Sequence, residues 1–351
     1  MRLKSFNKEK EYKRLKKSNK GKAAYVTTLI SFCAFAIVVA YVFSNSFAFK
    51  SNESFSFVDG EAHIEQILYL KEQILADNSV LNNTPDFSKI STDADTGLYL
   101  GTEDLADNNG NTYYFRGTKE LLNNNVRFAG YIWKVLRING DGSIRLFNYT
   151  TGTSGVFNND TVNLSERAFY VHSDGTDSDA KALLETWYRN RLKVNYDNYI
   201  VDSIFCNDTN MTNATTFAAD TRLRSYQPTL KCLNIADSYT KNIDKGNGKL
   251  SEKVGTITGD EISVAGGVYE KNGFTYFLFN ESDIWTMTPS GYAESDNLVA
   301  IMAVYWDPYF TTLESHGGGF GNAGLIPVIN LKSDVMITGG NGSEENPYVV
   351  K

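Results

Sequence analysis

The sequence has few of the residues on which most enzyme chemistry depends. Its 351 residues include three histidines and three cysteines, and neither set has the spacing of metal ligands. The run from His316 to Gly319 is similar to the oxyanion-hole segment of lipases, but the Gly-x-Ser-x-Gly segment that such enzymes need is absent. Ser295 to Asn297 matches one element of penicillin-binding enzymes, and the Lys-Thr-Gly element that should follow is missing. The sequence therefore indicates no catalytic residue, cofactor or metal site.

Positive charge is scarce outside one short segment. Residues 1–22 carry ten Lys or Arg residues against two acidic ones, whereas the rest of the chain has 24 basic and 39 acidic residues. An acidic surface repels the phosphate backbone, so the charge argues against nucleic acid as a partner. Beyond that, the acidic balance indicates mainly solubility.

Charged side chains are absent from Ala23 to Phe49. Ala23 to Phe43 would form a helix about 31 Å long, enough to cross a hydrocarbon core of about 30 Å. We therefore expect a basic cytoplasmic tail at 1–22 and a transmembrane signal anchor at 23–46, with everything after it outside the cell. Cleavage after Ser44 to Ser46 as a signal peptide is the alternative, although such peptides have apolar runs of about 7–15 residues. The expected location is the cell membrane, with a single span.

Two cysteines lie outside the predicted span, Cys206 and Cys232. In an exported chain such a pair is read first as a disulfide, and two thiolates alone cannot complete a zinc shell. The bond would contribute about 3–4 kcal/mol through the loop that it closes. If the host does not oxidise exported thiols, both remain free.

Residues 47–111 read as a juxtamembrane stalk. Within it, an apolar stripe at helical spacing predicts an amphipathic helix over 61–78, formed by Ile64, Ile67, Leu68, Ile74 and Leu75. The stripe either packs on the following domain or forms a homo-oligomer seam. Residues 79–111 are rich in Asn, Asp, Thr and Gly, which indicates a linker.

Residues 112–351 read as an extracellular, β-rich α+β domain. Apolar runs on either side of Asn139 to Gly142 predict a β-hairpin, because Asn, Asp and Gly tolerate the positive φ of tight turns. Apolar spacing predicts a helix over Ala180 to Tyr188, and Thr258 with Glu261 fits a capping box. Residues 195–248 read as a long loop region stapled by the disulfide. Further strands are predicted at Phe274–Phe279, Ile284–Thr288, Leu298–Tyr305 and Leu325–Leu331.

The stretch from Trp285 to Asn330 is the most site-like part of the sequence. It combines aromatic rings with glycines, and such loops make good recognition surfaces because rings bring contact area at low entropy cost. Trp285 and Trp133, which lie inside strand-like runs, are expected in the core. The candidate ligand-binding residues are Tyr292, Trp306, Asp307, Tyr309, Phe310 and His316.

Seven short segments carry a resemblance to a known family. They are Phe128–Arg145, Leu184–Tyr188, Gly255–Glu261, Ile284–Ser290, Ile326–Lys332, Ile337–Gly342 and Asn346–Val350. In this order they resemble an uncharacterised membrane-anchored surface-domain family of low-GC Gram-positive bacteria. The resemblance covers residues 112–351.

That family is distantly similar to formylglycine-generating-enzyme-like and C-type-lectin-like folds, so the resemblance implies a compact α+β domain with variable loops. It does not imply an activity, because this chain has no cysteine after Cys232 to match the paired catalytic cysteines of the formylglycine enzymes. The calcium-lectin motif Gln-Pro-Asp is represented only by Gln227 to Thr229. Ile326 stands before Pro327, where members of the family usually have Arg.

Three functions remain open. The first is a membrane-anchored, outward-facing binding or adhesion protein for a glycan or protein ligand, and the sequence favours it. The second is an exported enzyme, for which convergent titratable groups would be needed. The third is an envelope protein whose ectodomain assembles with itself.

Overall fold

The computed structural model describes residues 53–58, 61–148, 150–159, 161–271, 273, 275–278, 282–293, 298–307, 310–317 and 323–351. Side chains within 53–66, 292–300 and 302–317 are not described. The predicted tail and anchor lie outside the described residues. Among the residues that are described, no helix has the length and hydropathy needed to cross a membrane. The chain divides into two compact units, residues 1–67 and 68–351. In the first, β1 (Glu53–Val58) pairs antiparallel with β2 (Glu61–Gln66).

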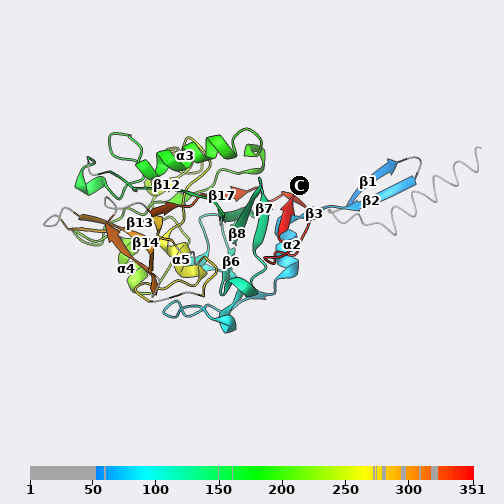
Figure 1. Ribbon diagram of the computed structural model, residues 1–351, viewed down its shortest axis with the longest axis horizontal. Helices are drawn as coiled ribbons and strands as arrows, with labels where there is room; N and C mark the ends of the chain where they lie inside the picture. Colours follow the sequence, from blue (N-terminus) through cyan, green and yellow to red (C-terminus); the bar gives the residue numbers. More distant parts are fainter. Residues whose placement is uncertain are drawn as a thin grey trace, which may run out of the picture. The chain divides into compact units, whose positions relative to one another are not determined.

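The second unit contains a ten-stranded mixed sheet (Figure 1). Its main path runs β3 (Leu68–Tyr69), β18 (Met336–Gly339), β19 (Tyr348–Val350), β7 (Asn125–Phe128), β8 (Tyr131–Ile138), β6 (Thr112–Arg116), β5 (Gly97–Gly101) and β4 (Val80–Leu81). Off this path, β9 (Ile144–Asn148) pairs with β8 and with β17 (Val328–Leu331). The pairs β19–β7 and β4–β5 are parallel. The prediction of a β-rich α+β domain is confirmed.

The predicted hairpin is present as β8 and β9. Ile138 pairs with Ile144, and the amide of Gly142 donates to the carbonyl of Asn139. Gly142 has φ of 82°, a left-handed conformation that suits glycine. The turn closes here because these residues tolerate a geometry that most side chains resist.

A five-stranded sheet has the order β10 (Thr153–Gly155), β16 (Ala323–Leu325), β13 (Ile284–Ala293), β14 (Leu298–Asp307) and β15 (Phe310–Gly317). A two-stranded sheet joins β11 (Phe205–Cys206) to β12 (Ser238–Tyr239). Trp133 and Trp285 are both fully buried, as predicted. The Trp133 ring packs edge-on against Trp187, while the indole N–H of Trp285 donates to the carbonyl of Gly155.

The described residues form four α-helices: α2 (Leu70–Asp77), α3 (Asp179–Arg191), α4 (Ala218–Arg224) and α5 (Gly259–Ala265). Short 3₁₀ helices occupy η1 (Asp93–Asp95), η2 (Glu103–Leu105), η3 (Lys119–Leu121), η4 (Leu164–Glu166), η5 (Asp197–Tyr199) and η6 (Ile235–Asp237). The predicted capping box begins α5, where Thr258 and Glu261 bond each other's backbone amides. All seven residues of α5 are buried, and the helix contacts both β6 and β13 (Figure 1). It therefore lies where the two large sheets meet.

Two boundaries differ from the prediction. The helix expected over 61–78 is confined to α2, because residues 61–66 form β2 and Leu68 pairs with Ile337 in the sheet. The compact unit begins at Leu68 rather than near Thr112. Residues 79–111 contain β4 and β5, and Tyr99 stacks on Tyr114. Their Asn, Asp and Thr residues make tight turns inside the domain and do not form a linker, since turn chemistry and linkers share one composition.

Candidate functional site

Five of the six residues predicted to bind a ligand belong to strands of the five-stranded sheet. Tyr292 is in β13, Trp306 and Asp307 are in β14, and Phe310 and His316 are in β15. The backbone register places Asp307 opposite Phe310, and His316 opposite Ile301. The side chains of these candidates, and all of Tyr309, lie outside the described part of the chain. Their role in binding stays a prediction.

The predicted disulfide between Cys206 and Cys232 is present, with the two Cα atoms 5.5 Å apart. The region around it is more ordered than the predicted loop, because 195–248 contains α4, β11 and β12. We call Thr229–Asp237 the disulfide ridge. The side-chain amide of Asn108 both donates to the carbonyl of Cys232 (2.8 Å) and accepts from its amide (2.8 Å). The ridge is thus held to the turn before β6 by hydrogen bonds as well as by the disulfide.

A polar pocket lies beside this ridge. It encloses about 40 Å³, and its wall includes both cysteines of the disulfide. A larger hollow of about 450 Å³ shares five of its lining residues, Asn108, Asn109, Ser203, Ile204 and Cys232. Leu233 and Ile235 line this hollow and are 73% and 66% exposed. The small pocket therefore adjoins a wider hollow, which is lined by Leu233 and Ile235 of the ridge and also by Asp141, Asp202, Asp244 and Lys245.

The floor of the pocket is a buried cluster of two arginines around one carboxylate. Arg137 on β8 donates from Nη1 to Glu261 on α5, and Nε of Arg145 on β9 lies 2.5 Å from the same carboxylate. Arg145 also stacks 4.5 Å over the ring of Phe205. Burial lowers the pKa of Arg145 to about 10, against the attraction of Glu261. Glu261 shows the opposite balance: burial favours its neutral form, but Arg145 and Arg137 hold its pKa below the ordinary value.

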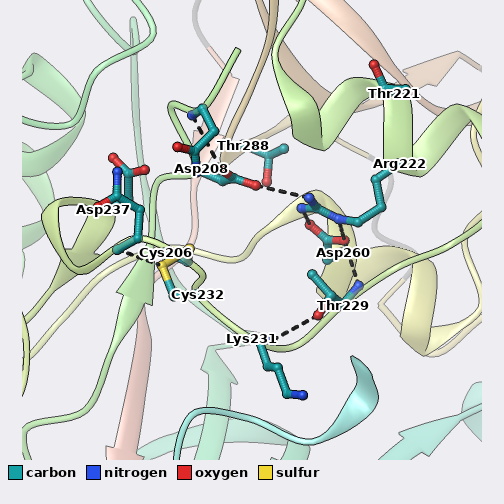
Figure 2. Close-up of polar contacts among 12 residues, drawn as sticks. Cys206, Asp208, Thr221, Arg222, Thr229, Lys231, Cys232, Asp237, Asp260 and Thr288 are labelled. Atoms are coloured by element: carbon teal, nitrogen blue, oxygen red, sulfur yellow. Dashed lines mark hydrogen bonds and ion pairs between the residues drawn. A yellow bond between two sulfur atoms is a disulfide. The ribbon is translucent and has the colours of Figure 1, made fainter. Parts of the chain in front are cut away.

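A second cluster forms one side of the pocket (Figure 2). Arg222 on α4 donates two parallel hydrogen bonds of 2.9 and 2.8 Å to Asp260. Its Nη1 donates a third, of 3.0 Å, to Asp208. Asp260 also accepts from the amide of Thr229, which ties this cluster to the disulfide ridge. Burial alone would lower the pKa of Arg222, but the bonds and charges of the two aspartates raise it above its ordinary value.

Asp237 lies at the end of the disulfide ridge, and its pKa is raised above the ordinary value of an aspartate. It lies beside the disulfide in Figure 2. Burial raises its pKa, while the amide and hydroxyl of Thr209, which donate to its two oxygens, act in the other direction. Asp237 is not among the residues that line the small pocket.

The carboxylates of the pocket are suited to holding geometry. Glu261, Asp260 and Asp208 each face an arginine, and the two oxygens of Asp107 accept from the amides of Asn109 and Gly140. Glu261, whose pKa its two arginines hold low, is a weak general acid at neutral pH. Among the described residues, no group of three or more His, Cys, Asp or Glu is arranged to hold a metal ion. The arrangement can instead offer a ligand hydrogen-bonding groups that are already fixed in place.

These pocket residues were not among those predicted from the sequence to bind a ligand. Glu261 was recognised only as a helix cap, and Arg137 and Arg145 were read as parts of strands. A signal was present, because a charged residue inside an otherwise apolar strand indicates a buried charge with a partner. The register of the hairpin places Arg137 directly opposite Arg145. Comparisons with protein-family models, curated proteins and solved structures found no match to this chain.

Proposed function

We propose that this protein is a membrane-anchored surface protein that binds or adheres to a ligand through a C-type-lectin-like ectodomain. The uncharged stretch at 23–49 behind ten basic residues supports the anchor and its orientation. The disulfide between Cys206 and Cys232 supports an oxidising, extracellular location. The segments that resemble the Gram-positive surface-domain family support the class of fold.

The observation that carries the proposal is the charged pocket beside the disulfide ridge. Its walls come from segments far apart in the chain, including the turn at Asp107–Asn109, the β8–β9 hairpin and the start of α5. Such convergence of polar groups in a concave site is typical of ligand recognition. The disulfide fixes the ridge before any ligand arrives, and a preformed site loses less conformational entropy on binding.

The ligand is a glycan or a protein, and the residues between Tyr292 and His316 that the sequence predicts to bind it are a second candidate site. Substitution of Trp306 or Tyr309, two of the residues predicted from the sequence to bind a ligand, tests that alternative directly. An exported enzyme would need a titratable group free to move a proton, and the carboxylates of the described pocket are held by arginines or backbone amides.

The test applies the full-length protein, reconstituted in lipid nanodiscs, to an array of glycans and cell-wall fragments, with calcium and then with a chelator. We expect saturable binding that Lys231→Gln weakens, because Lys231 lines the pocket. Lys249→Gln is the matched control, since Lys249 is an exposed lysine outside the pocket. Binding lost only in Trp306→Ala or Tyr309→Ala would move the site to the aromatic residues predicted from the sequence. No binding in either condition would contradict the proposal.

A further inference from the structure

The floor of the pocket holds more positive charge than its own carboxylate neutralises. The side chains of Arg137, Arg145 and Glu261 are 8%, 1% and 5% exposed, so two buried guanidinium groups share one carboxylate. The other acids nearby are engaged: Asp208 and Asp260 by Arg222, and Asp107 by backbone amides. Asp107 keeps its charge and attracts Arg145, and the whole lining has four cationic and four acidic side chains. An anion would therefore be attracted locally, by hydrogen-bond donors that these acids leave unused, and not by a net positive charge of the pocket.

Two cationic groups in the pocket have unused hydrogen-bond donors. Arg137 donates from Nε to Asn139 and from Nη1 to Glu261, and no acceptor among the described residues takes its Nη2. Lys231 also lines the pocket, and its ammonium pairs with none of the described acids. In Figure 2 the Lys231 side chain points away from Arg222, which already has two aspartate partners. Arg137 and Lys231 therefore each have a donor left for a ligand in the pocket that they line.

The size of the pocket limits what these donors can bind. About 40 Å³ is room for two or three water-sized groups, since one water needs roughly 10–15 Å³ by this measure. A planar carboxylate has two oxygens and fits the flat edge of a guanidinium, which it meets with parallel hydrogen bonds. The rest of a ligand would lie in the wider hollow, against Leu233 and Ile235.

We infer that this pocket binds the carboxylate group of the ligand, with Arg137 and Lys231 as its direct contacts. The inference rests on the proposed function, because it names the chemistry that the proposed site recognises. Glu261 and Arg145 are positioning residues, since Glu261 accepts from Arg137 and Arg145 holds Glu261. The carboxylate can belong to a peptide C-terminus or to an acidic sugar, and the experiment separates these two sources.

The experiment measures binding of two matched pairs of probes to the full-length protein in nanodiscs. One pair is N-acetyl-alanyl-alanine and its C-terminal amide, and the other is glucuronic acid and glucose. We expect at least one acid to bind about tenfold or more tightly than its neutral partner, as expected for a lost charge-assisted hydrogen bond. Sodium phosphate is titrated separately, and binding of phosphate without either acid would contradict a carboxylate site.

Three variants test which residues are responsible. Arg137→Lys keeps the charge beside Glu261 but loses the planar fork, so we expect it to reduce the preference for the acid. Lys231→Gln serves as the second variant, because this half-buried side chain has no described acidic partner whose loss would unfold the domain. Lys249→Gln should leave both probes unchanged.

The failure of this inference is distinguishable from failure of the proposed function. Array ligands that are neutral, or an equal affinity for acid and neutral probes, would overturn the carboxylate site and leave a binding protein. Unchanged preference in both Arg137→Lys and Lys231→Gln would also overturn it. If no ligand on the array binds, the proposed function itself is contradicted.

Discussion

The two charged clusters beside the pocket balance their charges in opposite ways. In one, Arg222 lies between Asp208 and Asp260, so a single cation meets two carboxylates. In the other, Glu261 is the single carboxylate between Arg137 and Arg145. The side chains of the second cluster are at most 8% exposed, whereas Arg222 is 17% exposed.

The Glu261 cluster supports the fold as a whole, whereas the Arg222 cluster supports the disulfide ridge. Glu261 is at the start of α5, the buried helix that contacts both large sheets, and its two arginines come from the β8–β9 hairpin. The Arg222 cluster ties α4 and the start of α5 to Thr229 on the ridge. Disruption of the Glu261 cluster should therefore lower the global stability, and disruption of the Arg222 cluster should mainly loosen the disulfide ridge.

The largest effect should come from Glu261→Gln. This change keeps the size of the side chain and its capping role but leaves two buried arginines without a counter-charge. Removing one partner of a buried ion pair costs about 3–5 kcal/mol of unfolding free energy. Urea denaturation of the protein measures this loss. Glu345→Gln, at an exposed position, should change the free energy by less than about 0.5 kcal/mol, and an equally small change in Glu261→Gln would refute the structural role of the cluster.

The double variant Cys206→Ser/Cys232→Ser should have the next largest effect. The disulfide closes a loop across a sequence separation of 26 residues, for which about 3–4 kcal/mol is expected. The hydrogen bonds between Asn108 and Cys232 stay available, so the ridge should loosen without being lost. Hydrogen exchange of residues 229–237 should rise together with the loss of stability. Unchanged exchange there would mean that the hydrogen bonds alone hold the ridge.

A smaller effect is expected from Arg222→Lys. Lysine keeps the charge but cannot make the two parallel bonds to Asp260, and a hydrogen bond to a charged group contributes about 1.5–3 kcal/mol. Thermal denaturation measures the loss, and Arg191→Lys at the exposed end of α3 is the control. A loss as large as that of Glu261→Gln would contradict the distinction between the two clusters.

Features that depend on neighbouring residues could be predicted from the sequence. The turn at Asn139–Gly142, the capping box of Thr258 and Glu261, and the burial of Trp133 and Trp285 all follow from local preference or pattern, and the structure has each of them. The disulfide followed from the number of cysteines in an exported chain, not from their spacing. These predictions needed no knowledge of the tertiary fold.

The pocket could not be predicted in the same way. Glu261 is 116 residues from Arg145 and 124 from Arg137 in the sequence, and nothing local to these residues says that they meet. Their pairing depends on how α5 packs against the hairpin. The predicted start of the domain was also wrong, because the Asn- and Asp-rich stretch 79–111 was interpreted as a linker from its composition alone. Polar turns inside a domain and polar linkers differ only in their long-range contacts.

The smallest expected effect is on the pH dependence of the unfolding free energy, to which Glu261 and Asp237 contribute with opposite sign. The pKa of Glu261 is lowered in the folded state, so its stabilisation is fully present above the unfolded pKa of about 4.3 and is lost as pH falls through the folded value. The gap in unfolding free energy between the wild type and Glu261→Gln should therefore narrow below about pH 4. The pKa of Asp237 is raised by burial, so its protonation favours the folded state as pH falls and opposes part of the loss. Denaturation of both proteins between pH 7 and pH 3 measures the gap. A gap that stays constant over this range would mean that Glu261 does not titrate with a lowered pKa, and the two arginines would then not be its counter-charges.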